Sequence, residues 1–347
     1  MKPVAADRWC ATYDDDLLTA VRVALADVPA GAALGVALSA GADSAMLALH
    51  AARVAVDTGR HLHCFHIHHG LQASADEWLN QAHRLAGLIG VSCHSRRVRV
   101  DAQGTGMEAA ARAARYAALA DLAAQAGVGH VLLAHHQDDQ AETVLLRLLR
   151  GAGPLGLGAM APVMRRDDLL YLRPWLDQPR SHILQAADRF AAISGWQPVH
   201  DPSNRDARYA RGAVRADLAP VLDGRWPAWR RTLARHARQA RELEQWALDA
   251  VREDWPRLDP DADGLGFSLA SWRLLPASRQ APVLRFWLRS QGLRMPTEAR
   301  LDAWLKQLRE VHALGHDRQV RLRHESHWIV VQKGRVLLVP ETSSKPS

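Results

Sequence analysis

The stretch from residue 34 to residue 49 limits the fold of this chain more than any other. The apolar run Gly35 to Leu38 predicts a short buried strand of a parallel sheet. Small residues follow at 39 to 42, and Asp43 and Ser44 stand where the first turn of a helix is expected. Free N–H groups at a helix N-terminus bind anions. The stretch therefore predicts a strand, a phosphate-binding turn and a helix.

This turn is neither of the two common phosphate-binding motifs. It lacks the Gly-Lys-Ser/Thr end of the Walker A loop and the three spaced glycines of the dinucleotide fingerprint. It resembles the Ser-Gly-Gly-x-Asp-Ser loop of the N-type ATP pyrophosphatases, which implies ATP binding by Ser39, Ala40, Gly41, Ala42, Asp43 and Ser44. Ala40 replaces the usual glycine, and we expect its backbone to have a conformation that alanine tolerates. A strand-to-helix turn without a ligand is the alternative.

Composition sets broad limits on the class of protein. A length of 347 residues predicts two or more domains, and the net charge of +7 indicates a polyanionic partner. The three cysteines, Cys10, Cys64 and Cys93, lie far apart, which disfavours a zinc ribbon, an iron–sulfur cluster or a redox pair. Neither a signal core nor a membrane-spanning stretch is recognisable. We therefore expect a cytoplasmic protein in a reducing compartment, with no membrane partner.

Strand and helix patterns alternate from residue 33 to residue 150, which predicts an α/β fold with a doubly wound, mostly parallel sheet. Further strands are expected over 61–68, 91–100, 130–134 and 169–176, and helices over 14–28, 74–90, 106–125 and 179–194. The second strand is rich in histidine, at His61, His63, His66 and His68, with His69 next to it. Alternation places these rings on both faces, so we favour a solvated or cleft-lining strand end over a metal site.

A second informative stretch, His135 to Thr143, follows the strand at 130–134. Asp138, Asp139 and Glu142 lie in the first turns of the next helix, where they can hold a magnesium ion or a cationic amine. Pairing with the helix dipole is the alternative. Because parallel strands end at one edge of a sheet, this stretch and the phosphate-binding turn are predicted to share one active site.

Basic residues dominate residues 205 to 241, where Trp226 and Trp229 interleave with arginines. Basic density with aromatics is typical of RNA contact, and a solvated helix face is the alternative. One long helix is expected over 230–255, followed by helices over 270–291 and 296–310. Short strands are expected over 318–323, 327–332 and 336–339, with Lys333-Gly334 as a hairpin turn.

Several motifs occur in an order that is similar to the tRNA(Ile)-lysidine synthetase family over residues 33 to 220. They include His69-Gly70-Leu71, Glu108 to Tyr116, Arg150 to Gly153, Arg173-Pro174 and Asp201 to Asn204. Residues 270 to 310 resemble the family's substrate-binding C-terminal domain. We therefore expect a catalytic domain over 1–220, of the adenine nucleotide alpha hydrolase-like or PP-loop type. A helical linker over 221–260, a smaller α+β tRNA-binding domain over 261–340 and a disordered tail over 341–347 would follow.

The resemblance implies a specific reaction. ATP and Mg²⁺ activate the C2 carbonyl oxygen of the wobble cytidine in a tRNA(Ile) with a CAU anticodon, giving an adenylated intermediate and pyrophosphate. The amine of free L-lysine then attacks C2 and releases AMP. The product is lysidine. An anticodon that would otherwise read AUG then reads AUA.

The resemblance also implies residue roles. Ser39, Gly41 and Ser44 would bind the diphosphate, and Asp43 and Asp139 would place the magnesium ion. Asp138, Asp139 and Glu142 would bind lysine, and a carboxylate or His135 could accept its proton. The arginines with a predicted catalytic role, which would stabilise phosphate charge, are Arg112, Arg115 and Arg208. The residues with a predicted role in tRNA binding are Arg205, Arg211, Arg215, Arg230, Arg231 and Arg235.

Three other functions remain open at this point. A tRNA sulfur transferase on the same scaffold would normally need a catalytic cysteine pair, and the cysteine spacing argues against it. A non-catalytic RNA-binding protein would not need acids beside a phosphate loop. An amidotransferase-coupled ATP pyrophosphatase would need a glutaminase that is not recognisable here. For the lysidine synthetase that the resemblance implies, a homodimer is a possible assembly.

Overall fold

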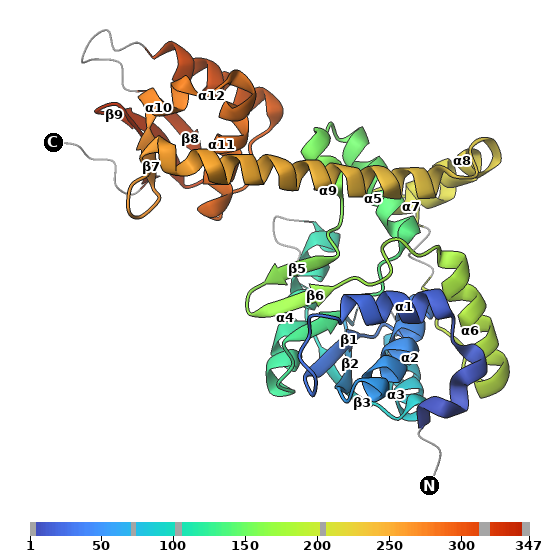
Figure 1. The fold of residues 1–347 in the computed structure, drawn as a ribbon. Helices are drawn as coiled ribbons and strands as arrows, with labels where there is room; N and C mark the ends of the chain where they lie inside the picture. Colours follow the sequence, from blue (N-terminus) through green and yellow to red (C-terminus); the bar gives the residue numbers. More distant parts are fainter. Residues whose placement is uncertain (1–4, 71–73, 101–105, 202–205, 312–319, 342–347) are drawn as a thin grey trace. The chain divides into compact units, whose positions relative to one another are not determined.

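The computed structural model describes residues 5–70, 74–100, 106–201, 206–311 and 320–341 (Figure 1). Its internal contacts divide the chain into two units, Met1–Arg238 and Gln239–Ser347. The division falls inside the helix α9 (Trp229–Asp254). The domain boundaries expected at 220 and 260 therefore stay predictions. Within the described residues, no helix combines the length and apolarity needed to cross a membrane.

A six-stranded sheet lies at the centre of the first unit, with the strand order β3-β2-β1-β4-β6-β5. All neighbouring strands pair in parallel except β5, which pairs antiparallel with β6. This confirms the predicted doubly wound, mostly parallel sheet. The strands are β1 (Ala33–Ala37), β2 (His61–His68), β3 (Ser92–Arg97), β4 (His130–Leu132), β5 (Val163–Arg166) and β6 (Leu169–Leu172). Strand β3 is shorter than the predicted 91–100, and β5 was not predicted.

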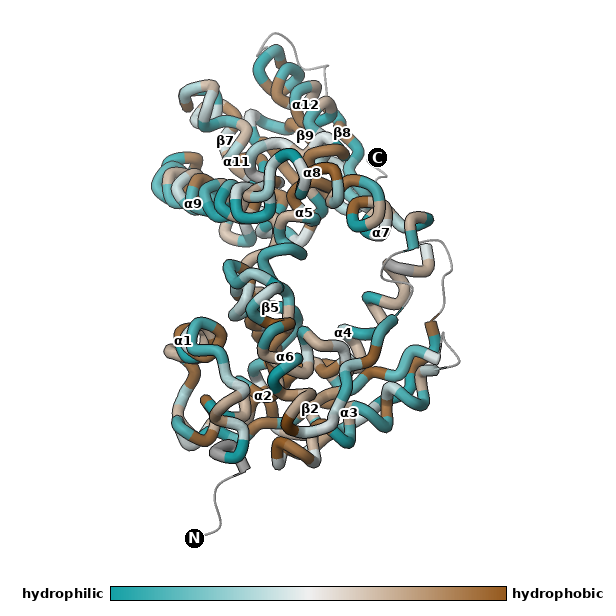
Figure 2. The backbone as a smooth tube through the Cα atoms, turned by 90° about the vertical axis from the view of Figure 1, so that its right-hand side faces the viewer, coloured by the Kyte–Doolittle hydropathy of each residue, from teal (hydrophilic) through white to brown (hydrophobic). Residues whose placement is uncertain are grey.

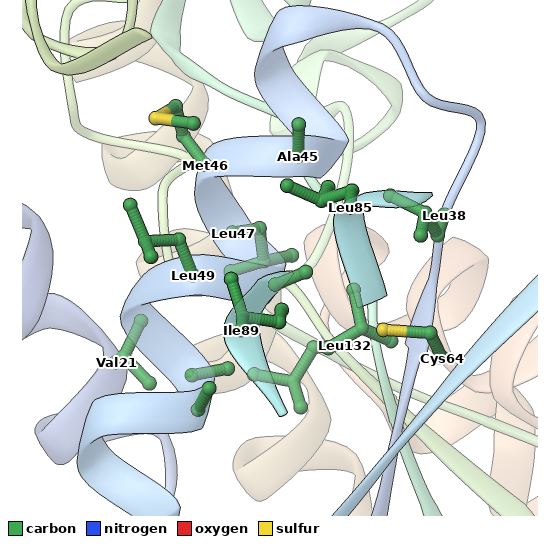
Figure 3. Close-up of a cluster of buried hydrophobic side chains, with 14 of the residues drawn as sticks. Val21, Leu38, Ala45, Met46, Leu47, Leu49, Cys64, Leu85, Ile89 and Leu132 are labelled. Carbon is green, nitrogen blue, oxygen red and sulfur yellow. The ribbon is translucent and has the colours of Figure 1, made fainter. Parts of the chain in front are cut away.

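Helices cover both faces of this sheet. One hydrophobic cluster joins the sheet to α1 (Asp15–Ala24), α2 (Ala42–Asp57), α3 (Ala75–Ile89) and α6 (Arg180–Ser194), and a second cluster joins it to α4 (Met107–Gln125). Figure 3 shows Met46, Leu47 and Leu49 of α2 gathered with Ile89 of α3 and Leu132 of β4. These residues are all buried. Burial of its apolar face holds α2 against the sheet and so sets the position of its first turn.

The strand order places the phosphate-binding turn at a topological switch point. Strand β1 pairs with β2 on one side and with β4 on the other. The chain adds β2 and β3 on one side of β1 and then crosses over to add β4 on the other side. Ligands of such sheets bind in the crevice at the carboxyl ends of the two central strands. The turn at 38–41 follows β1, and the acid-rich start of α5 (Gln137–Leu149) follows β4. Gly35 of β1 is required by packing, because a Cβ there would lie 2.4 Å from the Phe65 ring.

The connection from α6 to α9 contains short helical pieces between residues 210 and 225. They are α7 (Ala210–Ala213), a π-helical turn (Val214–Leu218) and α8 (Ala219–Arg225). Helix α9 follows and is hydrophilic along most of its length (Figure 2). Gly212 of α7 allows a close backbone approach, because a Cβ there would lie 1.9 Å from the Asp206 carbonyl oxygen.

The second unit is an α+β domain built on an antiparallel sheet with the order β7-β10-β9-β8. Its elements are β7 (Gly266–Ser268), α10 (Leu269–Leu274), α11 (Ala277–Ser290), α12 (Glu298–Glu310), β8 (Arg321–His324), β9 (His327–Gln332) and β10 (Arg335–Pro340). The single helix predicted over 270–291 is wrong, because Pro276 holds the preceding Leu275 in an extended conformation. The hairpin turn is confirmed, since Lys333 and Gly334 have φ values of 48° and 74° between paired strands.

Candidate active site

Two serine hydroxyls hold the turn after β1 in shape. The Ser39 backbone N–H donates to Ser44 Oγ at 3.1 Å, and the two hydroxyl oxygens lie 3.0 Å apart. Ser44 Oγ in turn donates to the Gly41 carbonyl oxygen at 3.2 Å. No described side chain caps the N-terminus of α2 at Gly41. The first-turn N–H groups of this helix therefore remain available for an anion.

The backbone of Ala40 contradicts our expectation. Its φ is 63°, in the left-handed region that favours glycine, so the prediction of a conformation that alanine readily tolerates is wrong. The turn imposes this conformation because the Ala40 carbonyl accepts a hydrogen bond from the Val199 N–H at 3.0 Å, and the methyl group is fully buried. A left-handed alanine costs roughly 1–2 kcal/mol.

A cavity of about 380 Å³ opens beside this turn, within the size range of small-molecule sites. Ser39 and Gly41 line it on one side, and Arg115 of α4 lines it on another. The end of β2 contributes His66, His68 and His69, which supports the cleft-lining interpretation of the histidine-rich strand. His66 Nδ1 bonds to the Leu38 carbonyl at 2.9 Å, so this ring also fixes the end of β1.

The acids of α5 meet arginines from the connection before α9. Arg215 binds Glu142 with two nitrogens, at 2.7 and 2.9 Å, and reaches Asp139 Oδ1 at 3.1 Å. Arg211 lies 3.4 Å from Glu142 and donates to Thr143 Oγ1 at 2.8 Å. Asp139 and Glu142 are both buried, so each carboxylate needs such a partner. The structure thus brings two predicted tRNA-binding arginines to two of the three predicted lysine-binding acids.

The other two acids of the site also have arginine partners. Arg180, the first residue of α6, binds both oxygens of Asp43 at 3.1 Å. Arg230 lies 2.9 Å from Asp138 and also bonds to Asp223. All four carboxylates that the sequence singled out are therefore neutralised within the first unit.

His136 connects the phosphate-binding turn to the acids. Its ring nitrogen Nε2 lies 3.8 Å from Asp43 Oδ1 and 3.4 Å from Asp139 Oδ2. The ring also caps α5, because Nδ1 accepts from the Asp139 N–H while the Asp139 carboxylate accepts from the His136 N–H. This capping box explains why α5 begins here and points its acids toward the turn after β1.

The pKa values of two possible proton acceptors, Glu142 and His135, are shifted in opposite directions. Burial raises the pKa of Glu142, although Arg215 opposes this. Burial alone would raise the pKa of Asp139 too, but His136, His135 and the nearby arginines together lower it. Desolvation lowers the pKa of His135 to about 3, and its Nδ1 already accepts a hydrogen bond from Arg173 Nε at 3.2 Å.

The remaining predicted arginines fall into three groups. Arg112 and Arg115 lie on α4, where Arg115 faces the cavity and Arg112 stacks over the Tyr116 ring at 5.2 Å. Arg208 is exposed and binds Asp206, so the structure does not bring it to the acids. Arg231 and Arg235 are exposed on α9. Arg205 lies outside the described residues, and the Glu108 side chain is also not described.

Two functional candidates were missed from the sequence. Arg180 lies 137 residues from Asp43 along the chain and belongs to no motif, so no sequence signal pointed to it. Arg173 is buried and orients His135 while donating to the Ala161 carbonyl at 2.7 Å. The Arg-Pro pair at the end of β6 was a usable signal for Arg173, because it places a charged residue at the carboxyl edge of the sheet.

Among the described residues, one further group has metal-ligand geometry. Ligand atoms of Asp14, Asp16 and His182 all lie within 4.8 Å of one another. This group is remote from the predicted ligands Asp43 and Asp139 in sequence. Asp14 already caps α1 by accepting from the Leu17 N–H at 3.1 Å, and the Asp16 side chain is 71% exposed. It therefore gives no support to the predicted magnesium site.

Comparisons with known proteins agree over both units. Residues 18–222 match the family model of the PP-loop domain, and residues 267–337 match that of the TilS substrate binding domain. The chain is 56% identical to the tRNA(Ile)-lysidine synthase of Bordetella bronchiseptica over 309 residues, covering 89% of this chain and 90% of the relative. Identity to the tRNA(Ile)-lysidine synthase of Ralstonia nicotianae is 46%, covering 81% of this chain and 60% of the relative.

A solved structure agrees on the fold alone. The U34-tRNA thiolase NcsA from Methanococcus maripaludis, with its 4Fe–4S cluster, superposes with a TM-score of 0.53 at 14% identity. The alignment covers 65% of this chain and 77% of that chain.

The PP-loop match implies that the chain uses ATP. Taken with the relatives, the two matched domains show that the chain belongs to the tRNA(Ile)-lysidine synthase family.

Proposed function

We propose that this chain ligates free L-lysine to C2 of the wobble cytidine in a tRNA(Ile) with a CAU anticodon, forming lysidine. The observation that supports this most is the meeting of the phosphate-binding turn with the buried pair Asp139 and Glu142 at one sheet edge. ATP binding alone would require only the turn. The carboxylates add a site for a cationic substrate, and an amine is the chemistry that they fit.

In the first step, the C2 carbonyl oxygen of the cytidine attacks the α-phosphorus of ATP. An O–P bond forms and pyrophosphate leaves. Ser39 lines the cavity beside the turn, and the Ser44 hydroxyl lies 3.0 Å from that of Ser39. These two residues and the first-turn N–H groups of α2 would hold the β- and γ-phosphates. Arg115 lines the same cavity and would stabilise charge that develops on the transferred group.

Asp43 and Asp139 would hold the magnesium ion. Their donor atoms are hard carboxylate oxygens, which this ion prefers, and both face the ring of His136. The guanidinium groups of Arg180 and Arg215 pair with these two carboxylates. Both carboxylates therefore already face a positive charge, and they fit a cation. When bound, the ion would neutralise phosphate charge and polarise the P–O bonds.

In the second step, the lysine amine attacks C2, a C–N bond forms, and the C2–O bond breaks as AMP leaves. The amine must first lose a proton. Glu142 is the better acceptor than His135, because its pKa is raised toward the working pH whereas that of His135 is lowered to about 3. Asp138 and Asp139 would then bind the substrate's cationic groups.

Cysteine chemistry argues against sulfur transfer as the alternative. Burial raises the pKa of Cys64, and burial raises that of Cys93 to about 11. A thiolate is the reactive form of cysteine, so neither residue is poised as a nucleophile. Cys10, the third cysteine, is exposed.

The test incubates the full chain with radiolabelled L-lysine, ATP and a CAU-anticodon tRNA(Ile). We expect label to enter the tRNA with one AMP formed for each lysine. A tRNA whose wobble base is uridine serves as the control and should stay unlabelled. Turnover of ATP without label in the tRNA would reject lysine ligation. A homodimer stays a prediction, and the mass of the complex in solution tests it separately.

A further inference from the structure

A buried arginine, Arg173, lies at the carboxyl edge of the sheet directly after β6. Strand β6 pairs in parallel with β4, and the Leu133 N–H donates to the Leu172 carbonyl at 2.8 Å. The chain segments that follow these two strands therefore run side by side. Their side chains meet where Arg173 Nε donates to His135 Nδ1 at 3.2 Å.

The guanidinium of Arg173 is held by neutral acceptors. Besides His135 Nδ1, it donates to the Ala161 carbonyl at 2.7 Å and to the Met164 sulfur at 3.5 Å. Among the described residues, no carboxylate pairs with it, and burial lowers its pKa. Burying a charge without a counterion costs free energy. Its place beside the candidate active site therefore indicates a task other than stabilising the fold.

We propose that Arg173 is a positioning residue that fixes His135 in the neutral Nε2–H tautomer, so that His135 donates a hydrogen bond to a negatively charged oxygen of the bound substrates. This inference rests on the proposed function, in which the α-phosphate of ATP carries such oxygens through both steps. It removes His135 from the role of proton acceptor and gives it the opposite role, that of a donor.

The tautomer follows from the direction of the hydrogen bond. A guanidinium has N–H donors and no acceptor, so Nδ1 of His135 must be the acceptor. In a neutral imidazole only one nitrogen carries a proton, so that proton is on Nε2. Within the described part of the chain, no group forms a hydrogen bond with Nε2. This N–H is thus left for a ligand.

The charges around His135 favour a neutral ring and an anionic ligand. Burial is the largest cause of its lowered pKa, and the positive charges of Arg173, Arg115 and Arg112 add to it. Asp139 alone opposes them. Arg115 also lines the cavity beside the phosphate-binding turn. A phosphate oxygen complements this corner, because it gains both N–H donors and nearby positive charge.

The first test reads the tautomer directly. The full chain is prepared with ¹⁵N-labelled histidine, the ring nitrogen shifts are measured by NMR, and His135→Gln assigns the signal of His135. In the wild type we expect a neutral ring with its proton on Nε2. A proton on Nδ1, or a charged ring at neutral pH, would overturn the proposal. This measurement requires no activity and no substitution at Arg173.

Arg173→Met and Arg112→Met form a matched pair for the same measurement. Each removes one guanidinium whose charge lowers the pKa of His135, but only Arg173 bonds to its Nδ1. We expect both tautomers to be populated in Arg173→Met and the Nε2–H form alone in Arg112→Met. An unchanged ring in Arg173→Met, or an equal change in both variants, contradicts positioning by the hydrogen bond. If Arg173→Met does not fold, the wild-type spectrum still decides the tautomer.

Activity measurements separate positioning from a purely structural role. His135→Gln keeps an N–H donor near the place of Nε2 and should lower kcat less than tenfold, whereas His135→Asn should lower it by about 10²–10³-fold. Arg173→Met should lower kcat about tenfold in the wild-type background, as for the loss of one hydrogen bond. In the His135→Gln background its effect should nearly vanish, because no tautomer remains to be fixed.

Equal losses from Arg173→Met in the two backgrounds would show that Arg173 acts through the fold, and the proposal would be overturned. A kcat that is higher in His135→Asn than in His135→Gln would reject Nε2 as the donor. If the wild-type chain does not label tRNA with lysine at all, the proposed function has failed, whereas the tautomer of His135 can still be measured.

Discussion

The phosphate-binding turn and the acidic start of α5 lie at the same sheet edge but are built in different ways. Every hydroxyl contact within the turn joins residues at most five apart, such as Ser39 and Ser44. The acids of α5 instead find partners far along the chain, as Glu142 does with Arg215, 73 residues away, and Asp139 does with Arg215, 76 residues away. The hydroxyl network of the turn is thus set by its own sequence, and Val199 adds one distant backbone bond to Ala40. The acid cluster instead depends throughout on the folded connection before α9.

This difference also appears in the electrostatics. The turn presents neutral hydroxyls and N–H groups, and the first-turn N–H groups of α2 can bind an anion without first losing a partner. The acids are each held by an arginine, so a cationic substrate or a metal ion must displace or share that guanidinium. Binding at the acids should therefore be more sensitive to charge changes in distant residues.

The largest effect is expected at Asp43, where the two regions meet. Asp43→Asn removes the carboxylate that faces both Arg180 and His136. AMP formation that depends on lysine and tRNA should therefore fall by about 10²–10³-fold, the typical loss for an electrostatic catalytic group. The thermal unfolding midpoint should change little. Asp57→Asn is the matched control at the other end of α2, where Asp57 pairs with Arg22 and Arg53. Undiminished AMP formation in Asp43→Asn would remove Asp43 from the site.

An intermediate effect is expected at Glu142. Glu142→Gln should raise the KM for lysine about tenfold or more and leave the KM for ATP nearly unchanged, because only the amine needs this charge. The wild-type kcat should fall as the pH drops through the raised pKa of Glu142, since the base must be deprotonated to act. The variant should lack this acidic limb.

His135→Gln is the control for the pH profile. With a pKa of about 3, His135 is already neutral across roughly pH 5–8, where an unperturbed histidine would titrate. Its replacement should leave the acidic limb where it is. An acidic limb that disappears in His135→Gln and persists in Glu142→Gln would reverse the assignment.

The smallest effect is expected in the backbone of the turn. Ala40→Gly relieves a left-handed alanine worth roughly 1–2 kcal/mol but loses a buried methyl worth about 0.8 kcal/mol. The free energy of unfolding should therefore stay within about 1 kcal/mol of the wild type. Ala42→Gly, at the first helical position of α2, should destabilise by about 0.5–1 kcal/mol. Equal losses in both variants, measured by urea denaturation, would show that φ at Ala40 costs nothing.

Much of the first unit could be predicted because its signals are local. The strand at 61–68 has the predicted bounds, and α4 and α6 begin and end within a residue of their predictions. The edge strand β5 was missed because Val163 to Arg166 is mostly exposed and shows no alternation. The split between α10 and α11 was missed although Pro276 marked it, since apolar residues continue on both sides of the proline.

The sequence by itself determined the order of strands and helices, the phosphate-binding turn and the acids of α5, because propensity, periodicity and capping act over a few residues. Only the tertiary structure decided which arginine meets which acid. Arg211, Arg215 and Arg230 belonged to one basic stretch in the sequence. In the structure they are half-buried and pair with Glu142, Asp139 and Asp138, while Arg231 is exposed. The positions of charged residues along a chain do not show which way each side chain points. A guanidinium finds its partner only when packing desolvates both groups and brings them within hydrogen-bonding distance.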